Sequence, residues 1–158
     1  MAKEKLLPLE TPEEILQILQ DTDYETALSL HELGKKLDCK IEAKTGAKSY
    51  KITYALTKPK KRALFTIECN DVKWQVKANL FRIANYELEV ATSPDKIKQC
   101  IKATRACVLC NPGCTGRASY VIDGETLLPC YGSGHYFKGL DTHEWQRLEE
   151  LITFESKA

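Results

Sequence analysis

The chain has 158 residues, of which 43% are hydrophobic, so it is long enough to bury the core of one domain without disulfides. Its 23 lysines and arginines nearly balance its 22 aspartates and glutamates, and a net charge of +1 gives no general attraction to nucleic acid or to an anionic membrane. The first residues lack the apolar region of a signal peptide, and no run of 18 apolar residues occurs. A cytoplasmic protein without a membrane span is therefore expected.

Two helices are predicted over residues 11–37. The segment TPEEILQILQ begins with Thr11, a favoured N-cap residue, followed by Pro12 for the first helical position and Glu14 for a capping box. The next segment, DTDYETALSLHELGKKL, repeats apolar residues at helical spacing, which indicates a helix with one buried stripe. Its apolar residues include Tyr24, Ala27, Leu28, Leu30, Leu33 and Leu37.

Residues 39–81 alternate apolar and polar side chains, which is the pattern of a sheet with one buried face. In SYKITYAL, the side chains of Tyr50, Ile52, Tyr54 and Leu56 share a face. Further strands are expected in CKIEAK, ALFTIEC and VKWQVKANLF, the last with an inward row of Trp74, Val76, Ala78 and Leu80. The short connections between these segments predict an antiparallel meander.

A helix, a cysteine-rich loop, a hairpin and a final helix are expected over residues 93–154. In SPDKIKQCIKAT, Ser93 and Pro94 suit the N-cap and the first position of a helix. In ASYVIDGETLLPC, Asp123 and Gly124 suit the two-residue turn of a hairpin. The glycine-rich segment YGSGHYFKGL that follows is predicted to be a loop.

The last predicted helix lies in DTHEWQRLEELITF and begins with a capping box formed by Asp141 and Glu144. Its inward-facing residues are expected to be Trp145, Leu148, Leu151 and Ile152. Together the elements predict a single α+β domain over residues 1–158, in which helices pack on one face of an antiparallel meander sheet.

Seven cysteines are many for a chain of this length, and an odd number without an export signal argues against a disulfide framework. Cys39, Cys69 and Cys100 lie in apolar or strand-like contexts, so we expect them to be small buried residues. The other four are clustered, in the pattern Cys107-x2-Cys110-x3-Cys114-x15-Cys130.

The spacing of the clustered cysteines predicts a zinc site. Two thiolates two residues apart bind one tetrahedral ion from a single turn, and the predicted hairpin returns Cys130 toward the same ion. Soft thiolate ligands select zinc or an iron–sulfur cluster over magnesium or calcium. Because four thiolates fill a tetrahedron, we expect a structural metal without an open position for water.

Three alternatives to zinc stay open. An iron–sulfur cluster also takes thiolates, although the common ferredoxin run is C-x2-C-x2-C. Cys107 and Cys110 resemble a redox pair, but no βαβ setting surrounds them. Unconnected loop thiols are the third alternative. His135, five residues after Cys130, either replaces a cysteine as a metal ligand or hydrogen bonds locally, and we favour the local bond.

Aromatic residues near the glycine-rich segment are candidates for a ligand site, because small-molecule pockets combine aromatic walls with a few polar groups. The predicted ligand-binding residues are Tyr54, Tyr131, His135, Tyr136 and Phe137. P-loop, dinucleotide-binding and nucleophile-elbow motifs are absent from the sequence, as is the zinc-deaminase pattern. The sequence therefore favours a non-enzymatic function over an enzymatic one.

The segment KSYKITYALTKPKKR is basic, with no acidic residue between Lys48 and Arg62. Its lysines and the interleaved Tyr50 and Tyr54 suggest contacts to nucleic acid. The same lysines also suit a solvated strand face and turn that protect a sheet edge. No recognised nucleic-acid-binding motif accompanies them, so nucleic acid is the less favoured partner class.

The region from about Ser49 to Phe154 resembles small bacterial domains of unknown function, in which a meander precedes a helix, a segment like C-P-[YF]-G-E-G-G and a last helix. Here that segment is CYGSGH, residues 130–135, and it lacks the proline, the acid and the final glycine. Such domains are similar to the GyrI-like α/β fold, which binds small molecules in a cleft across its sheet. The resemblance implies a fold and a small-molecule site, and CVLCNPGC departs from it.

Three hypotheses for the function follow. The first is a zinc-stabilised domain that binds an unknown small molecule or protein partner. The second is a nucleic-acid-binding zinc module that uses the basic turn Lys58–Arg62. The third is a thiol-redox or metal-dependent enzyme.

Overall fold

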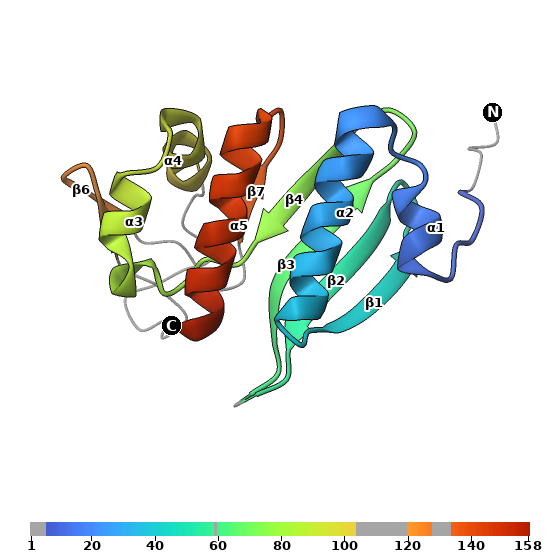
Figure 1. Cartoon of the computed structure of the whole chain (residues 1–158), viewed down its shortest axis with the longest axis horizontal. Coiled ribbons are helices and arrows are strands. Elements are labelled where there is room, and N and C mark those ends of the chain that lie inside the picture. Colours follow the sequence, from blue (N-terminus) through green and yellow to red (C-terminus); the bar gives the residue numbers. More distant parts are fainter. Residues whose placement is uncertain (1–5, 59, 104–119, 128–133) are drawn as a thin grey trace. The chain divides into compact units, whose positions relative to one another are not determined.

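The computed structural model describes residues 6–58, 60–103, 120–127 and 134–158 (Figure 1). The fold is α+β, as predicted, and it forms two compact units, Met1–Val76 and Lys77–Ala158. Among the helices of the described residues, none is long and apolar enough to cross a membrane.

The main sheet has five strands in the order β1-β2-β3-β4-β7. The predicted antiparallel meander over residues 39–81 is confirmed. Its strands are β1 (Lys40–Thr45), β2 (Tyr50–Leu56), β3 (Arg62–Cys69) and β4 (Trp74–Ala78). In the register of β2 and β3, Ile52 lies opposite Ile67, and the pairing shifts between Tyr54 and Ala55. This irregularity explains why Ala55 is buried together with both of its neighbours, against strict alternation.

The fifth strand, β7 (His135–Phe137), lies in the segment that we predicted to be a glycine-rich loop, so the loop prediction is wrong there. His135 and Phe137 are buried, whereas Tyr136 between them is exposed. Three residues of alternation are too few to outweigh the glycines on either side as a sequence signal.

In the first unit, α1 (Pro12–Leu16) and α2 (Asp21–Lys36) cover one face of the sheet (Figure 1). The N-cap role of Thr11 is confirmed, because its hydroxyl accepts a hydrogen bond from the Glu14 backbone N–H at 3.2 Å. The return bond of the predicted capping box differs: the Thr11 hydroxyl itself donates to Glu14 Oε1 at 3.0 Å. The N-terminus of this short helix is therefore fixed by local polar contacts.

The buried stripe of α2 consists of Ala27, Leu30, His31 and Gly34. At Gly34 the helix approaches the sheet closely, since a Cβ atom there would lie 2.3 Å from Cδ1 of Tyr54. Any larger residue would have to push the aromatic ring or the helix aside. This close approach sets the depth at which α2 packs on Tyr54.

The second unit contains η1 (Ile83–Asn85), α3 (Glu87–Ala91), α4 (Asp95–Lys102), the hairpin of β5 (Tyr120–Ile122) and β6 (Glu125–Leu127), and α5 (Thr142–Lys157). The capping box of α5 is confirmed, with Glu144 N–H donating to Asp141 Oδ1 and Asp141 N–H donating to Glu144 Oε1, both at 2.8 Å. The inward residues of α5 are buried as predicted: Trp145, Leu148, Leu151 and Ile152.

The predicted start of α4 is wrong by one position. Pro94 is the N-cap, and the Ser93 hydroxyl donates to the Glu89 carbonyl at 2.7 Å instead of capping α4. Arg147 of α5 reaches the same place, because its Nε donates to Ser93 Oγ at 3.1 Å and its Nη2 donates to the Glu89 carbonyl at 2.6 Å. The short helix α3, which we did not predict, supplies the carbonyl that draws Ser93 away.

A buried carboxylate connects α5 to the segment before α3. Glu155 Oε1 accepts hydrogen bonds from the Arg82 backbone N–H at 2.9 Å and from the Tyr86 hydroxyl at 2.7 Å. Glu155 is fully buried, so these bonds offset the cost of removing its carboxylate from water. They place η1 and the start of α3 along the C-terminal half of α5.

Candidate functional site

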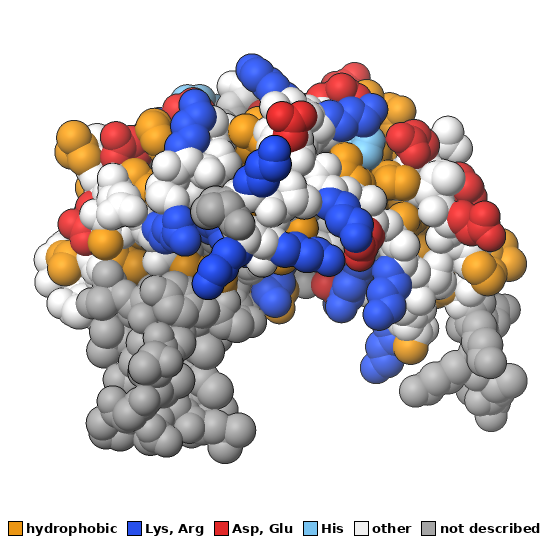
Figure 2. Space-filling model, turned by 90° about the horizontal axis from the view of Figure 1, so that it is seen from below, with side chains coloured by type: hydrophobic (Ala, Val, Ile, Leu, Met, Phe, Trp, Pro, Cys, Tyr) orange, Lys and Arg blue, Asp and Glu red, His pale blue; other side chains and the backbone are white. Residues whose placement is uncertain are grey.

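The basic turn between β2 and β3 belongs to the first unit. Lys58, Lys60 and Lys61 are exposed, and Figure 2 shows lysine and arginine side chains gathered on one face. Tyr50 and Tyr54, the tyrosines of the same basic segment, are buried on the face of β2 opposite the exposed Lys51. They are therefore not available to stack on bases, and contacts of this turn to nucleic acid would depend on charge alone.

Tyr54, one of the predicted ligand-binding residues, lies in the core of the first unit. Its ring stacks on Phe65 with a centroid distance of 4.3 Å, and its hydroxyl is 2.8 Å from His31 Nδ1. Burial raises the pKa of Tyr54 far above its ordinary value, and the nearby Glu13 carboxylate raises it further. The phenol is thus neutral at physiological pH, and it acts as a hydrogen-bonding group inside the core.

His31 is a polar core residue that we did not predict. Its Nδ1 pairs with the Tyr54 hydroxyl, while its Nε2 has no hydrogen bond in the described residues and faces Glu13 Oε1 at 3.5 Å. A signal for its burial exists in the sequence, since His31 lies four residues after Ala27 and three before Gly34 on the buried stripe. A polar residue on an otherwise apolar stripe is easily assigned to the solvent side.

The four clustered cysteines lie outside the described residues, as does Tyr131. The other three cysteines are free thiols: Cys69 is buried, whereas Cys39 and Cys100 are half-buried. Burial raises the pKa of Cys69 to about 11 and raises the pKa values of Cys39 and Cys100 as well. These three thiols are therefore protonated and unreactive near neutral pH. Within the described ranges, no group of three or more metal-ligating side chains comes together.

His135 is held in the core of the second unit. Its Nε2 lies 3.1 Å from the hydroxyl of Tyr120, and both side chains are buried. Burial lowers the pKa of His135 to about 4, although hydrogen bonds with the backbone of Leu80 and Ile101 act in the opposite direction. The imidazole is neutral at pH 7, and the partners of His135 are far from it in the sequence.

Tyr136 and Phe137 have opposite environments. Phe137 is fully buried, whereas the Tyr136 side chain is 46% exposed, with Lys77 Nζ 5.9 Å from the centroid of its ring. Tyr136 is therefore the predicted ligand-binding residue that offers an accessible aromatic surface in the described part of the chain. A surface pocket of about 230 Å³ in the first unit and another of about 330 Å³ in the second are lined by other residues.

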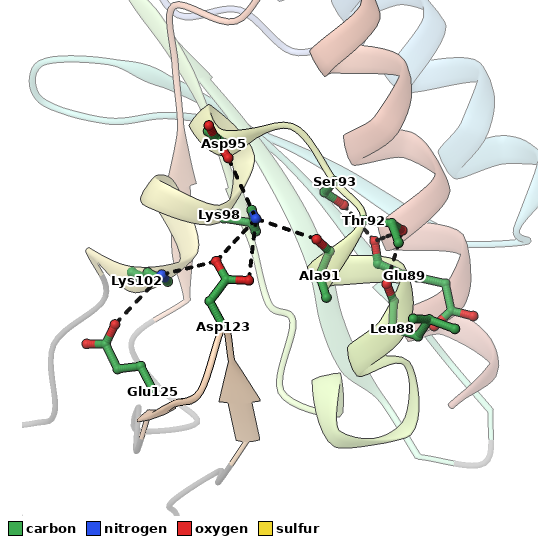
Figure 3. A network of polar contacts seen from close by, with 10 residues as sticks. All are labelled: Leu88, Glu89, Ala91, Thr92, Ser93, Asp95, Lys98, Lys102, Asp123 and Glu125. Atoms are coloured by element: carbon green, nitrogen blue, oxygen red, sulfur yellow. Dashed lines mark hydrogen bonds and ion pairs between the residues drawn. The ribbon is translucent and has the colours of Figure 1, made fainter.

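The turn of the β5–β6 hairpin is docked on α4 by ion pairs (Figure 3). Asp123 Oδ2 lies 3.1 Å from Lys98 Nζ and 3.4 Å from Lys102 Nζ, and Glu125 Oε2 lies 3.8 Å from Lys102 Nζ. The hydrogen bond between Asp123 and Lys98 lowers the pKa of the carboxyl and raises the pKa of the amine. The network keeps the charged forms paired across neutral pH.

The conformation of the turn agrees with the prediction made from its sequence. Asp123 and Gly124 have φ values of 51° and 80°, as the two central residues of a primed hairpin turn require. Aspartate tolerates this left-handed region better than most residues, and glycine adopts it without strain. The turn therefore presents the Asp123 carboxylate to α4 without a large backbone cost.

Comparisons of the chain with protein families, with curated proteins and with solved structures found no match. The resemblance to the GyrI-like fold consequently stays a prediction.

Proposed function

We propose that the protein is a binding domain whose surface is stabilised by one structural zinc ion, with Cys107, Cys110, Cys114 and Cys130 as its ligands. The partner is a small molecule or a protein. Tyr136 and the neighbouring Tyr131 form part of the surface that meets it. The ion's role is to order the loop, since four thiolates leave no position for a reacting water.

The observation that best supports the proposal is that two described residues, each shortly before one of the cysteines, are in contact through their side chains. Lys102 lies five residues before Cys107, Glu125 lies five residues before Cys130, and the Lys102 and Glu125 side chains are 3.8 Å apart. Five extended residues reach at most about 17 Å. Both arms are thus long enough to bring their sulfurs to one ion.

The segments that follow Cys114 and Cys130 also lead to residues that contact each other. Tyr120 follows Cys114 by six residues, and His135 follows Cys130 by five. The Tyr120 hydroxyl and His135 Nε2 are 3.1 Å apart inside the core of the second unit. A rigid core that anchors each arm lowers the entropy lost when the cysteines gather around a metal ion.

Metal analysis combined with a matched pair of variants tests the proposal. We expect about one zinc per chain in protein purified without chelator, and a lower melting temperature after a strong chelator is added. Cys110→Ser should lower the zinc content and the melting temperature together. The control is Cys100→Ser, which changes a half-buried thiol of α4 outside the cluster and should keep the metal. Wild-type protein that holds no metal and melts identically with chelator would contradict the proposal.

A nucleic-acid-binding function is the second candidate, supported by the exposed Lys58, Lys60 and Lys61. If it is correct, affinity for a single-stranded oligonucleotide falls steeply with salt, and changing all three lysines to glutamine reduces the slope of log K against log salt by about two. The same three-lysine variant should bind zinc normally. An affinity that is unchanged by the substitutions would exclude this turn as the contact.

A further inference from the structure

The surface pocket of about 330 Å³ in the second unit is lined mainly by polar side chains. Four of its lining residues belong to α5 and are spaced at i, i+3, i+4 and i+7, so they form one stripe along the helix. The other two come from the connection between α3 and α4. The lining residues are Thr92, Pro94, His143, Gln146, Arg147 and Glu150. The volume is enough for a small ligand, and the walls suit a polar one.

Neutral groups hold the guanidinium of Arg147 in one orientation at this pocket. Its Nε donates to Ser93 Oγ at 3.1 Å, and its Nη2 donates to the Glu89 carbonyl at 2.6 Å and to Thr92 Oγ1 at 2.9 Å. Both hydroxyls can accept these bonds because each donates its own hydrogen to a carbonyl of α3 (Figure 3). Since these acceptors are uncharged, they orient the cation without neutralising it.

The remaining nitrogen of Arg147, Nη1, donates to Glu150 Oε2 at 2.7 Å. In the described part of the chain, Glu150 supplies the carboxylate that pairs with this guanidinium. The Glu150 side chain is 57% exposed, whereas that of Arg147 is 20% exposed. A pair between neighbours on a helix surface is weak, so Glu150 is a readily exchanged anion on a fixed cation.

Two further side chains of the stripe offer hydrogen-bond donors. His143 and Gln146 are exposed, and neither has a hydrogen-bond or ion-pair partner among the described residues. An imidazole N–H and an amide N–H both donate to oxyanions. A phosphate group accepts hydrogen bonds in several directions, whereas a carboxylate has two oxygens in one plane. Donors from three side chains therefore suit a phosphate better than a carboxylate.

We propose that this pocket binds a small phosphate-bearing molecule, with Arg147 as the cation and Glu150 as an internal competitor that the phosphate displaces. His143 and Gln146 donate to the other phosphate oxygens. Because the guanidinium is already oriented, little entropy is lost there when the ligand binds. The site contains neither the proposed zinc ligands nor Tyr136, and the inference does not depend on the metal.

The test is a titration with inorganic phosphate at constant ionic strength, followed through the backbone amide signals of Thr92, His143 and Gln146 in ¹H–¹⁵N spectra. Glu150→Gln keeps the size of the side chain and removes the competing charge, so phosphate should bind about two- to fivefold more tightly. The matched control is Glu125→Gln, which removes a carboxylate of the same unit outside the pocket. Its phosphate affinity should stay within about 1.5-fold of wild type, since salt screens a distant exposed charge.

Loss of a donor should have the opposite effect. His143→Ala and Gln146→Ala change exposed side chains without partners in the described residues, and each should weaken phosphate binding about two- to fivefold. Arg147→Lys keeps the charge and loses the planar fork, so binding should weaken about tenfold. Because Arg147 also contacts α3, its melting temperature is measured alongside, and the His143 and Gln146 variants decide if that variant unfolds.

Three results would overturn the proposal. Amide signals that do not shift with phosphate would mean that the pocket does not bind it. An affinity in Glu150→Gln that equals wild type, or that equals a gain in Glu125→Gln, would mean that Glu150 is not a specific competitor. Acetate that shifts the same signals at the same concentration would overturn the assignment to phosphate. None of these outcomes bears on the zinc proposal, which has its own test.

Discussion

Each unit of the molecule buries a histidine against a tyrosine, and the two pairs differ in how completely the imidazole is satisfied. His135 meets the Tyr120 hydroxyl and the backbone of Leu80 and Ile101. The Tyr54 hydroxyl is 2.8 Å from His31 Nδ1, whereas His31 Nε2 has no hydrogen bond within the described part of the chain and lies 3.5 Å from the Glu13 carboxylate. A fully hydrogen-bonded imidazole fixes the core around it, whereas a half-bonded one depends on a single neighbour.

The largest expected effect comes from the protonation of His135. Its folded-state pKa of about 4 lies below the ordinary value of about 6.5. The unfolded chain therefore binds the proton more readily between these pH values, so stability is complete above about pH 6.5 and falls as the pH decreases to 4. The full loss corresponds to about 3 kcal/mol.

The contribution of His135 can be isolated by comparing how steeply the unfolding free energy changes with pH in two proteins. Denaturant unfolding of wild type and His135→Gln between pH 4 and 7 should show a smaller decrease of the unfolding free energy in the variant. Carboxylates titrate in both proteins, so only the difference between the two curves belongs to His135. Parallel curves would mean that the histidine is not kept neutral in the folded protein.

A smaller but still large effect is expected in the first unit, where Gly34 limits the space above Tyr54. In Gly34→Ala, the added Cβ atom would lie 2.3 Å from Cδ1 of Tyr54. Overpacking of this kind lowers the free energy of unfolding by about 2 kcal/mol. The melting temperature should fall, and Gly34→Ala in a Tyr54→Leu background should cost less, because the ring that clashes is gone. An undiminished penalty in that background would place the strain elsewhere.

The smallest expected effect is the difference in stability between a variant without the Tyr54 hydroxyl and a variant without the Tyr120 hydroxyl. Tyr54→Phe leaves both nitrogens of His31 without a hydrogen bond in the described residues, whereas Tyr120→Phe leaves His135 its backbone partners. We expect the first variant to lose about 1 kcal/mol more than the second in urea unfolding at pH 7. Equal losses would show that Glu13 or another group satisfies His31 Nε2.

The sequence predicted the elements whose signals are local. The Asp141–Glu144 capping box and the Asp123-Gly124 turn are defined within four residues, and both are confirmed. The short helix α3 was missed because it has five residues and no side-chain cap. Strand β7 was missed because it is ordered by the burial of His135 and Phe137 against parts of the chain that are distant in the sequence.

The candidate site was harder to predict than the fold, because its contacts join residues that are far apart in the sequence. Asp123 pairs with Lys98, which lies 25 residues earlier in the chain, and no local sequence pattern indicates this partnership. His31 has a helical position that indicates burial, but its partner Tyr54 comes from another element. For the clustered cysteines, the sequence signal is their spacing, and the described contacts that support the metal proposal join residues far apart in the sequence.

Arg147 has a consequence for the order in which the second unit can form. Its guanidinium donates a hydrogen bond to the Glu89 carbonyl of α3 from a position 58 residues later in the chain. A five-residue helix is not stable in isolation, since the first turn of any helix is unfavourable to nucleate. While the ribosome is still adding residues, α3 therefore lacks this contact, which can form only after α5 has been synthesised.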